Sequence, residues 1–168
     1  NPGGARMTEE RRIITMLVEN EPGVTARVAS LFARRGYNIE TICGAPTANP
    51  KMSRITITLW TREEQFELVM KYLRRLINVI KVRDMTGENA VRRELALVCV
   101  RARPEDRAEI RSVVKSFRGR IVDTGRTHYI VEVVGGPDKI AALLQVLEPM
   151  GIKKLARSGV LALYREPS

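Results

Sequence analysis

The residues with the clearest chemical potential lie in the stretch 19–24, Glu-Asn-Glu-Pro-Gly-Val, between an apolar strand-like run and an amphipathic helical pattern. Pro22 suits the first turn of a helix, where its missing N–H is not needed, and Gly23 has no Cβ to shield the backbone donors behind it. Those donors and the positive end of the helix dipole suit a carboxylate. Seen alone, the stretch also suits an ordinary Pro-Gly turn that feeds a helix.

Two asparagines add groups that recognise polar ligands. Asn20 precedes the proline, and Asn38 follows Gly36 and Tyr37 at the next junction between helix and strand. Each side-chain amide has a donor and an acceptor, so it can bind a ligand carboxylate or ammonium. The alternative is local turn bonding for Asn20 and a left-handed turn position for Asn38. Because one lies at each strand-end turn of the same domain, we favour a ligand.

Residues for catalysis are absent from the sequence pattern. His128 is the single histidine, and a lone histidine in a strand is more often structural than catalytic. No Ser-His-Asp set, metal-ligand cluster or phosphate loop can be assembled, and Gly135-Gly136-Pro137 lacks the lysine and spacing of a P-loop. Cys43 and Cys99 lie far apart in apolar runs, which indicates reduced thiols. The sequence therefore predicts a protein without a catalytic site of its own.

Hydrophobic periodicity predicts the order β-α-β-β-α-β twice. Strands are expected at 12–18, 37–45, 53–60 and 77–83, and again at 95–100, 120–123, 129–134 and 160–164. The expected helical faces carry Val24, Val28, Leu31 and Phe32; Phe66, Val69, Met70 and Leu73; Ile110, Val113, Val114 and Phe117; and Ile140, Leu143, Leu144 and Leu147.

This order predicts an α+β fold of two tandem ferredoxin-like βαββαβ domains, with antiparallel sheets and helices on one face. We expect a flexible leader over residues 1–10, a first domain over 11–84, a polar linker over 85–94 and a second domain over 95–168. A half-covered four-stranded sheet of this size is marginal alone. Its open face or edges therefore need another copy or another protein.

Composition limits the environment and the partners. The chain has 168 residues, 44% of them hydrophobic, and a formal net charge of +10 without a basic run longer than a pair. Basic residues mixed with acidic ones on the expected helices are typical of a solvated surface. No apolar stretch approaches the roughly 20 residues that span a membrane, and no signal-peptide core is present. The sequence predicts a cytoplasmic protein without a membrane partner.

Several segments together resemble one known family. The stretch 19–24, the run Arg-Gly-Tyr-Asn-Ile-Glu at 35–40 and Ala-Pro-Thr at 45–47 are similar to the amino-acid-binding ACT domain of acetolactate synthase (acetohydroxyacid synthase) small, regulatory subunits. The resemblance continues through Phe117-Arg118-Gly119 and Ala156-Arg157-Ser158-Gly159, and it covers the chain from Arg11 on. The Asn-x-Pro-Gly turn alone would indicate only some ACT domain, whereas the 37–40 and 156–159 segments make the resemblance specific.

The resemblance implies a regulatory subunit that binds and activates a large catalytic subunit. It implies feedback inhibition by a branched-chain amino acid, valine ahead of leucine or isoleucine, in the biosynthesis of these amino acids. The large subunit would carry thiamine diphosphate, magnesium and FAD, and this chain no cofactor. Two first domains would pair into a homodimer with the effector at the interface. The implied effector contacts are Asn20, Pro22, Gly23 and Val24, with Asn38 and Ile39 from the facing chain.

The alternative is an amino-acid-sensing regulator that binds nucleic acid. RNA-recognition motifs share the βαββαβ order, and the chain is basic. Against this alternative, the third expected strand offers Ile55, Thr56 and Thr58, with only Trp60 at its end for base stacking. Aromatic residues make up 5% of the chain, and no helix-turn-helix segment is left over. We therefore expect no nucleic-acid partner.

Overall fold

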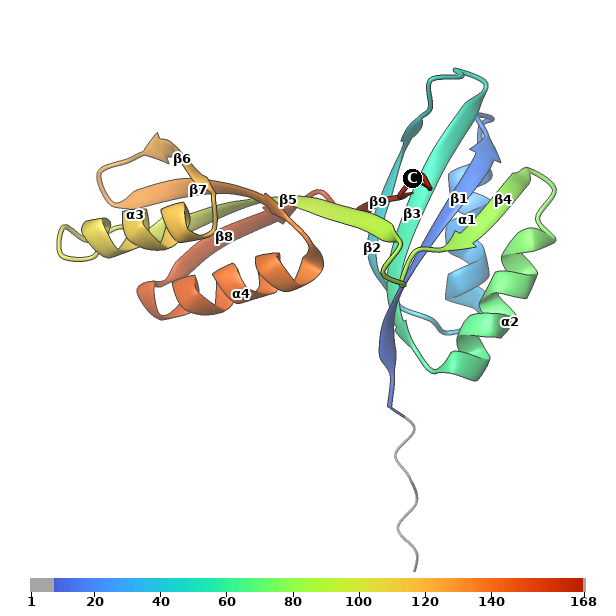
Figure 1. Cartoon of the computed structure of the whole chain (residues 1–168), viewed down its shortest axis with the longest axis horizontal. Coiled ribbons are helices and arrows are strands. Elements are labelled where there is room, and N and C mark those ends of the chain that lie inside the picture. The colour runs from blue at the N-terminus through green and yellow to red at the C-terminus, as the bar shows by residue number, and fades with distance from the viewer. Residues whose placement is uncertain (1–7, 168) are drawn as a thin grey trace, which may run out of the picture. The chain divides into compact units, whose positions relative to one another are not determined.

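The computed structural model describes residues 8–167, which form two compact units (Figure 1). The first unit runs up to Val91 and includes the chain from Ala162, and the second is Arg92–Leu161. The elements in chain order are β1 (Glu10–Glu19), α1 (Val24–Arg34), β2 (Ile39–Pro46), β3 (Met52–Thr61), α2 (Glu63–Arg74), β4 (Val79–Asp84), β5 (Ala90–Arg101), α3 (Arg107–Ser116), β6 (Arg120–Thr124), β7 (His128–Gly135), α4 (Pro137–Leu147), a 3-10 turn (Glu148–Met150), β8 (Ile152–Arg157) and β9 (Leu161–Tyr164).

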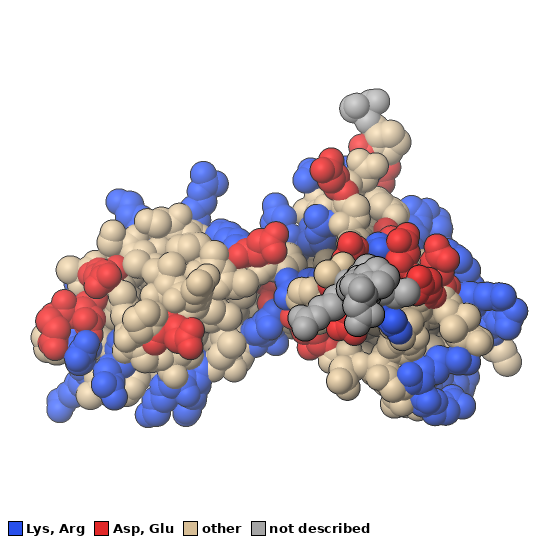
Figure 2. All heavy atoms as spheres, turned by 90° about the horizontal axis from the view of Figure 1, so that it is seen from below, with Lys and Arg blue, Asp and Glu red and all other residues tan. Residues whose placement is uncertain are grey.

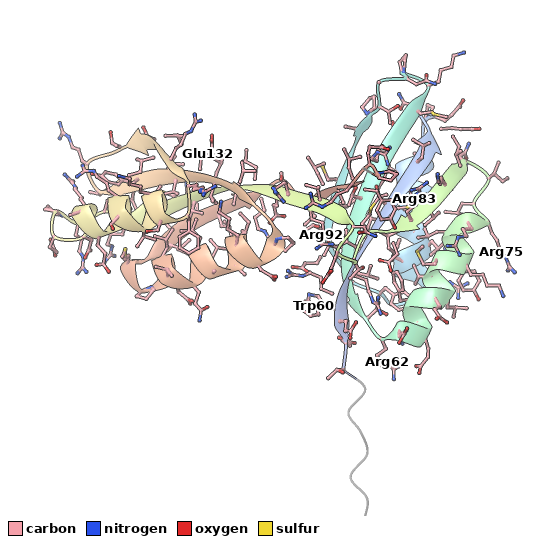
Figure 3. All side chains as sticks on the ribbon, in the orientation of Figure 1. Trp60, Arg62, Arg75, Arg83, Arg92 and Glu132 are labelled. Atoms are coloured by element: carbon pink, nitrogen blue, oxygen red, sulfur yellow. The ribbon has the colours of Figure 1, made fainter. Side chains whose placement is uncertain are left out.

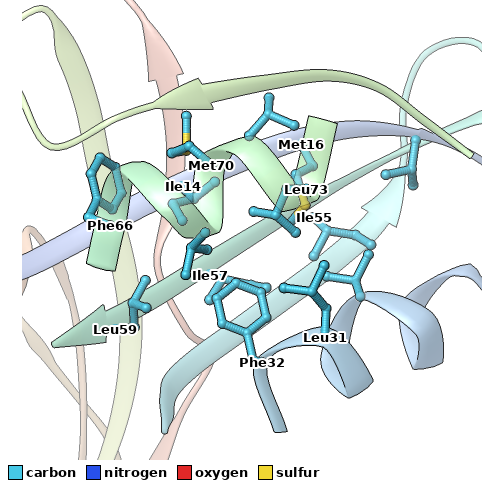
Figure 4. Packing of buried hydrophobic residues seen from close by; sticks show 14 of the residues in the cluster. Ile14, Met16, Leu31, Phe32, Ile55, Ile57, Leu59, Phe66, Met70 and Leu73 are labelled. Atoms are coloured by element: carbon cyan, nitrogen blue, oxygen red, sulfur yellow. The ribbon is translucent and has the colours of Figure 1, made fainter. Parts of the chain in front are cut away.

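The first unit is an antiparallel sheet in the order β2-β3-β1-β4 with α1 and α2 on one face. Alternation in β1 directs Ile14, Met16 and Val18 toward the helices, because successive side chains of a strand point to opposite faces. These residues pack with Phe32 of α1 and Leu73 of α2 in one buried cluster (Figure 4). The expected ferredoxin-like arrangement is confirmed for this unit.

The second unit repeats the arrangement, with strand order β6-β7-β5-β8 and the helices α3 and α4. Its core joins strand residues such as Val98 and Val131 to Ile110 of α3 and Leu143 of α4. The two-domain ferredoxin-like fold is therefore confirmed as a class.

One strand assignment in the second unit was wrong. We expected 160–164 as its fourth strand, but that position is taken by β8, which pairs with β5 through Val98 and Leu155. The sequence Ile-Lys-Lys-Leu-Ala-Arg lacks alternation because β8 is an edge strand whose residues after Ile152 are exposed. The strand at the chain's end does exist as β9, and it also pairs with β5.

The chain between the two units has more structure than a linker. Residues 85–94, expected as a polar linker, include the first residues of β5, which begins at Ala90. Met85 is buried, and its N–H donates to Ile13 O over 2.7 Å. The exposed residues of this segment are those of the short turn 87–89 and Arg93. Of the leader expected over 1–10, residues 1–7 lie outside the described part, and β1 already begins at Glu10.

The chain from Ala162 onward returns to the first unit. Ala162 is buried, the hydroxyl of Tyr164 donates to the carbonyl oxygen of Asp84, and Arg165 N–H donates to Asn89 O over 2.8 Å. Leu163 and Tyr164 face Thr15 across a hollow on the side of the sheet away from the helices. The last described residues are thus part of the first unit's structure.

Candidate functional site

The turn between β1 and α1 is fixed by bonds to two other loops. Asn20 N–H donates to Lys51 O over 2.8 Å, and its side-chain Nδ2 donates to Pro50 O over 3.0 Å. On the other side, Glu19 N–H donates to Asn78 O over 2.9 Å. The side-chain Nδ2 of Asn20 is therefore used in a local bond, whereas its side-chain Oδ1 has no hydrogen bond within residues 8–167.

Helix α1 begins directly after Gly23, whose φ of 84° places it in the left-handed region. That conformation explains the glycine, because a Cβ is strained there. It also moves Pro22 ahead of the N-cap, so our expectation of Pro22 inside the first turn was wrong. The helix start carries no side-chain cap, and the nearest bond, from Val24 N–H to Glu21 O, is long at 3.4 Å. The first-turn N–H groups are thus available to an anion.

Val24 is the first residue of α1, and its side chain points into the hydrophobic core. Its side chain is 4% exposed and belongs to the core cluster with Val28 and Leu31. A change of the Val24 side chain would therefore act through packing.

Sequence reasoning missed Asn78, which lies in the loop before β4. Its Nδ2 donates to Glu19 Oε2 over 2.9 Å, and its Oδ1 accepts a hydrogen bond from Arg27 of α1. Beside it, an apolar hollow of about 160 Å³ opens between the start of α1 and the end of α2, lined by Val24, Val28 and Ile77 among others. We expected a strand from Ile77 to Arg83, and the asparagine inside that apolar run was the available signal of a loop.

Asn38 and Ile39 lie at the opposite end of the same sheet. Ile39 pairs with Leu59, which pairs with Arg12, while the turn follows Glu19. Glu19 lies seven residue steps beyond Arg12 along β1, which corresponds to roughly 23 Å. One chain therefore brings Asn20, Pro22, Gly23 and Val24 together, but not Asn38 and Ile39.

The Asn38 end has its own polar hollow, of about 460 Å³, lined by Asn38, Glu40 and Trp60 among others. Arg11 pairs with Glu40 at 3.0 Å and lies 5.0 Å from the ring centroid of Trp60, which is half exposed (Figure 3). These contacts link the start of β1 to the start of β2 and the end of β3. Asn38 itself is exposed.

The corresponding junction in the second unit is filled by its own side chains. Arg103 Nε lies 2.6 Å from Asp106 Oδ2, and Asp106 is the N-cap residue of α3. The hydrogen bond to Asp106 and its charge, with that of Glu105, raise the pKa of Arg103. The side-chain Nε–H of Arg107 donates to Ala102 O over 3.2 Å. The Asp106 carboxylate makes no capping hydrogen bond to the start of α3, but it places a negative charge beside the point where a ligand carboxylate would approach.

The charge distribution and the placement of possible metal ligands do not indicate a nucleic-acid or metal site. On the face in Figure 2, each unit carries groups of Lys and Arg as well as groups of Asp and Glu. Among residues 8–167, no group of three or more His, Cys, Asp or Glu side chains is placed to hold a metal ion. No helix in that part of the chain is long and apolar enough to cross a membrane.

The strand order of the first unit, its two helices on one face and the glycine turn after β1 define an ACT domain. Residues 14–81 match the family described as an AHAS small subunit-like ACT domain, and residues 93–166 match the family described as the small subunit of acetolactate synthase. The chain belongs to the family of acetolactate synthase small subunits, as the sequence resemblance predicted.

Similar proteins support this membership over nearly the whole chain. An acetolactate synthase small subunit of Mycolicibacterium smegmatis is 44% identical, with 92% of this chain and 91% of the relative covered. A probable acetolactate synthase small subunit of Archaeoglobus fulgidus is 46% identical, with 92% and 97% covered. The crystal structure of the small subunit from Thermotoga maritima has a TM-score of 0.82 at 37% identity, with 95% and 99% covered.

Proposed function

We propose that this chain binds and activates the catalytic large subunit of acetolactate synthase and confers feedback inhibition by a branched-chain amino acid. Valine is the effector expected first, ahead of leucine and isoleucine. The observation that carries the proposal is the uncapped start of α1 behind Gly23, in a chain of this family. Backbone donors and a helix dipole at one point favour a carboxylate, the group shared by all amino acids.

The site that we propose is shared between two copies of the chain. Asn20, Pro22, Gly23 and Val24 would come from one copy, and Asn38 and Ile39 from the facing copy. The separation of the two sets within one chain supports this arrangement, since neither set can reach the other's ligand alone. The apolar hollow beside the turn suits a branched aliphatic side chain. A homodimer through the first units is therefore part of the proposal.

The chemistry of the enzyme is assigned to the partner. The large subunit is expected to bind thiamine diphosphate, magnesium and FAD, and this chain to bind none of them. The small subunit would act by favouring one of two arrangements of the complex when the effector binds. The cytoplasmic location expected from the sequence belongs to the same proposal.

Thermal unfolding of the full chain tests effector binding. Valine, leucine and isoleucine are added in turn, with D-valine as the control of matched composition. A ligand at 100 times its Kd that binds only the folded state adds about 2.7 kcal/mol to the free energy of unfolding. If L-valine and D-valine give the same shift, the effector site is wrong. Activation and inhibition are then measured by acetolactate formation with the reconstituted large subunit.

A further inference from the structure

Three basic side chains gather on the sheet face of the first unit that α1 and α2 do not cover. Leu17 of β1 pairs with Arg54 of β3 on one side and with Lys81 of β4 on the other, and Thr15 pairs with Arg83. Because directly paired residues of antiparallel strands project to the same face, all three cations lie on the side opposite Ile14 and Met16. They line one hollow of about 260 Å³.

The cations of this hollow lack the partners that other arginines have. Arg11, Arg103 and Arg157 are each bonded to a carboxylate at 3.0 Å or less. Within residues 8–167, no carboxylate lies within ion-pair distance of Arg54, Lys81 or Arg83. The one acid at the hollow is Glu166, which is exposed. Three positive charges facing one negative charge leave an uncompensated positive field there.

The returning chain end gives the hollow a second wall. Leu163 and Tyr164 line it opposite Thr15 and Leu17. The Arg83 guanidinium lies 5.1 Å from the ring centroid of Tyr164 (Figure 3), and the Tyr164 hydroxyl is bonded to Asp84 O. A cation held against an aromatic ring loses less conformational freedom when it binds a ligand. The arrangement is more ordered than a solvated row of basic residues.

We propose that this hollow binds an oxyanion with two or more negative charges, of the size of phosphate or pyrophosphate, as a second ligand site separate from the β1–α1 turn. Arg54 and Arg83 would each present two N–H donors to the oxyanion, and Lys81 a point charge. Glu166 offsets one of the three positive charges and leaves two, so a ligand with two or more negative charges is favoured. The site lies on the opposite face of the sheet from α1 and its turn.

Size and charge pattern favour a small ligand over a nucleic acid. The hollow is enclosed on one side by the chain end, and its volume is below the usual range of about 300–1,000 Å³ for drug-sized ligands. A nucleic-acid surface needs a longer basic track, whereas this hollow is lined by three basic residues and one acid.

The test is titration of the full chain, followed by unfolding temperature and by calorimetry, at constant ionic strength set with sodium chloride. The probes are inorganic phosphate, pyrophosphate and succinate, which separate phosphate ligands from dicarboxylates. We expect phosphate or pyrophosphate to raise the unfolding temperature beyond chloride. Arg54→Gln and Lys81→Gln should each weaken binding about tenfold, since each removes a charge-assisted contact.

Lys71→Gln is the matched control, because Lys71 is an exposed lysine of α2 on the covered face. It makes the same change of net charge and should leave the affinity unchanged. The unfolding transition without added anion shows whether each variant is folded. Because Lys81 is exposed, Lys81→Gln removes no contact of the hydrophobic core. Three results would overturn the proposal. The first is an unfolding temperature that phosphate and pyrophosphate raise no more than chloride does. The others are a loss of pyrophosphate affinity in Lys71→Gln as large as in Arg54→Gln, and tighter binding of single-stranded RNA than of pyrophosphate.

Discussion

The two junctions that follow the first strand of each unit occupy the same place in the same fold, yet they differ in charge. After β1, the left-handed Gly23 leaves the first N–H groups of α1 uncapped. After β5, Pro104 is followed by Glu105 and Asp106. Helix α3 also begins without a side-chain cap, but the Arg103–Asp106 pair lies beside its start. A repeated fold thus provides two helix starts, and a few side chains decide which can accept a ligand.

Removing the partner of the buried Glu94 in the second unit should have the largest effect. Glu94 has a fully buried side chain, and its Oε1 lies 2.7 Å from Arg157 Nε. Arg157→Met leaves that carboxylate buried without its partner, which costs about 3 kcal/mol in free energy of unfolding. Arg120→Met, on an exposed position of β6, is the control. Chemical denaturation measures both, and equal stabilities would contradict the assigned role of the pair.

Charge at the open turn should have the next largest effect. Gly23→Asp places a carboxylate at the helix start and should weaken valine binding about a hundredfold, since like charges at contact distance repel. Gly23→Asn is the matched control, because both residues tolerate a left-handed backbone and differ only in charge. Calorimetry with valine gives the two affinities. If both variants lose binding equally, backbone strain rather than the ligand explains the glycine.

Mixing two variants tests whether the site is shared between copies. Chains with Gly23→Asp and chains with Asn38→Ala should each bind valine poorly alone. In a mixed dimer, one site has both changes and the other has neither. Random exchange should therefore restore about a quarter of the wild-type sites. Valine stoichiometry after refolding the mixture is the measurement, and no recovery would show that both residues serve one chain's own site.

Opening the second junction should have the smallest effect. Glu105→Gly with Asp106→Ala removes both acids and places a glycine after Pro104, as in the first unit. We expect unchanged valine stoichiometry, because this junction has no counterpart of Asn20, and Arg107 still bonds to Ala102 O. A second valine per chain would reduce the difference between the units to these two positions. The contacts that raise the pKa of Arg103 stabilise the fold at every pH below the ordinary pKa of arginine. This stability is lost only as the pH rises through the raised pKa, so stability in the neutral range does not depend on pH through this group.

The parts of the structure that follow from local sequence were predictable, and the long-range parts were not. Apolar residues at helical spacing, such as Val28 and Phe32, identified α1, and they are buried as expected. The edge strand β8 carries exposed lysines and gave no alternation, so the fourth strand was placed too late. Asn78 was missed because its role depends on Glu19 and Arg27, which come from distant positions in the chain.

The return of the chain from Ala162 to the first unit has a consequence for synthesis on the ribosome. The first unit emerges first, but Leu163 and Tyr164 follow only after the whole second unit has been translated. Until then, the uncovered sheet face around Thr15 and Met85 lacks its final contact. Domains usually fold in the order in which they emerge. Here the earliest segment is completed last, so a ribosome that stalls late in the message releases a chain whose first unit is unfinished.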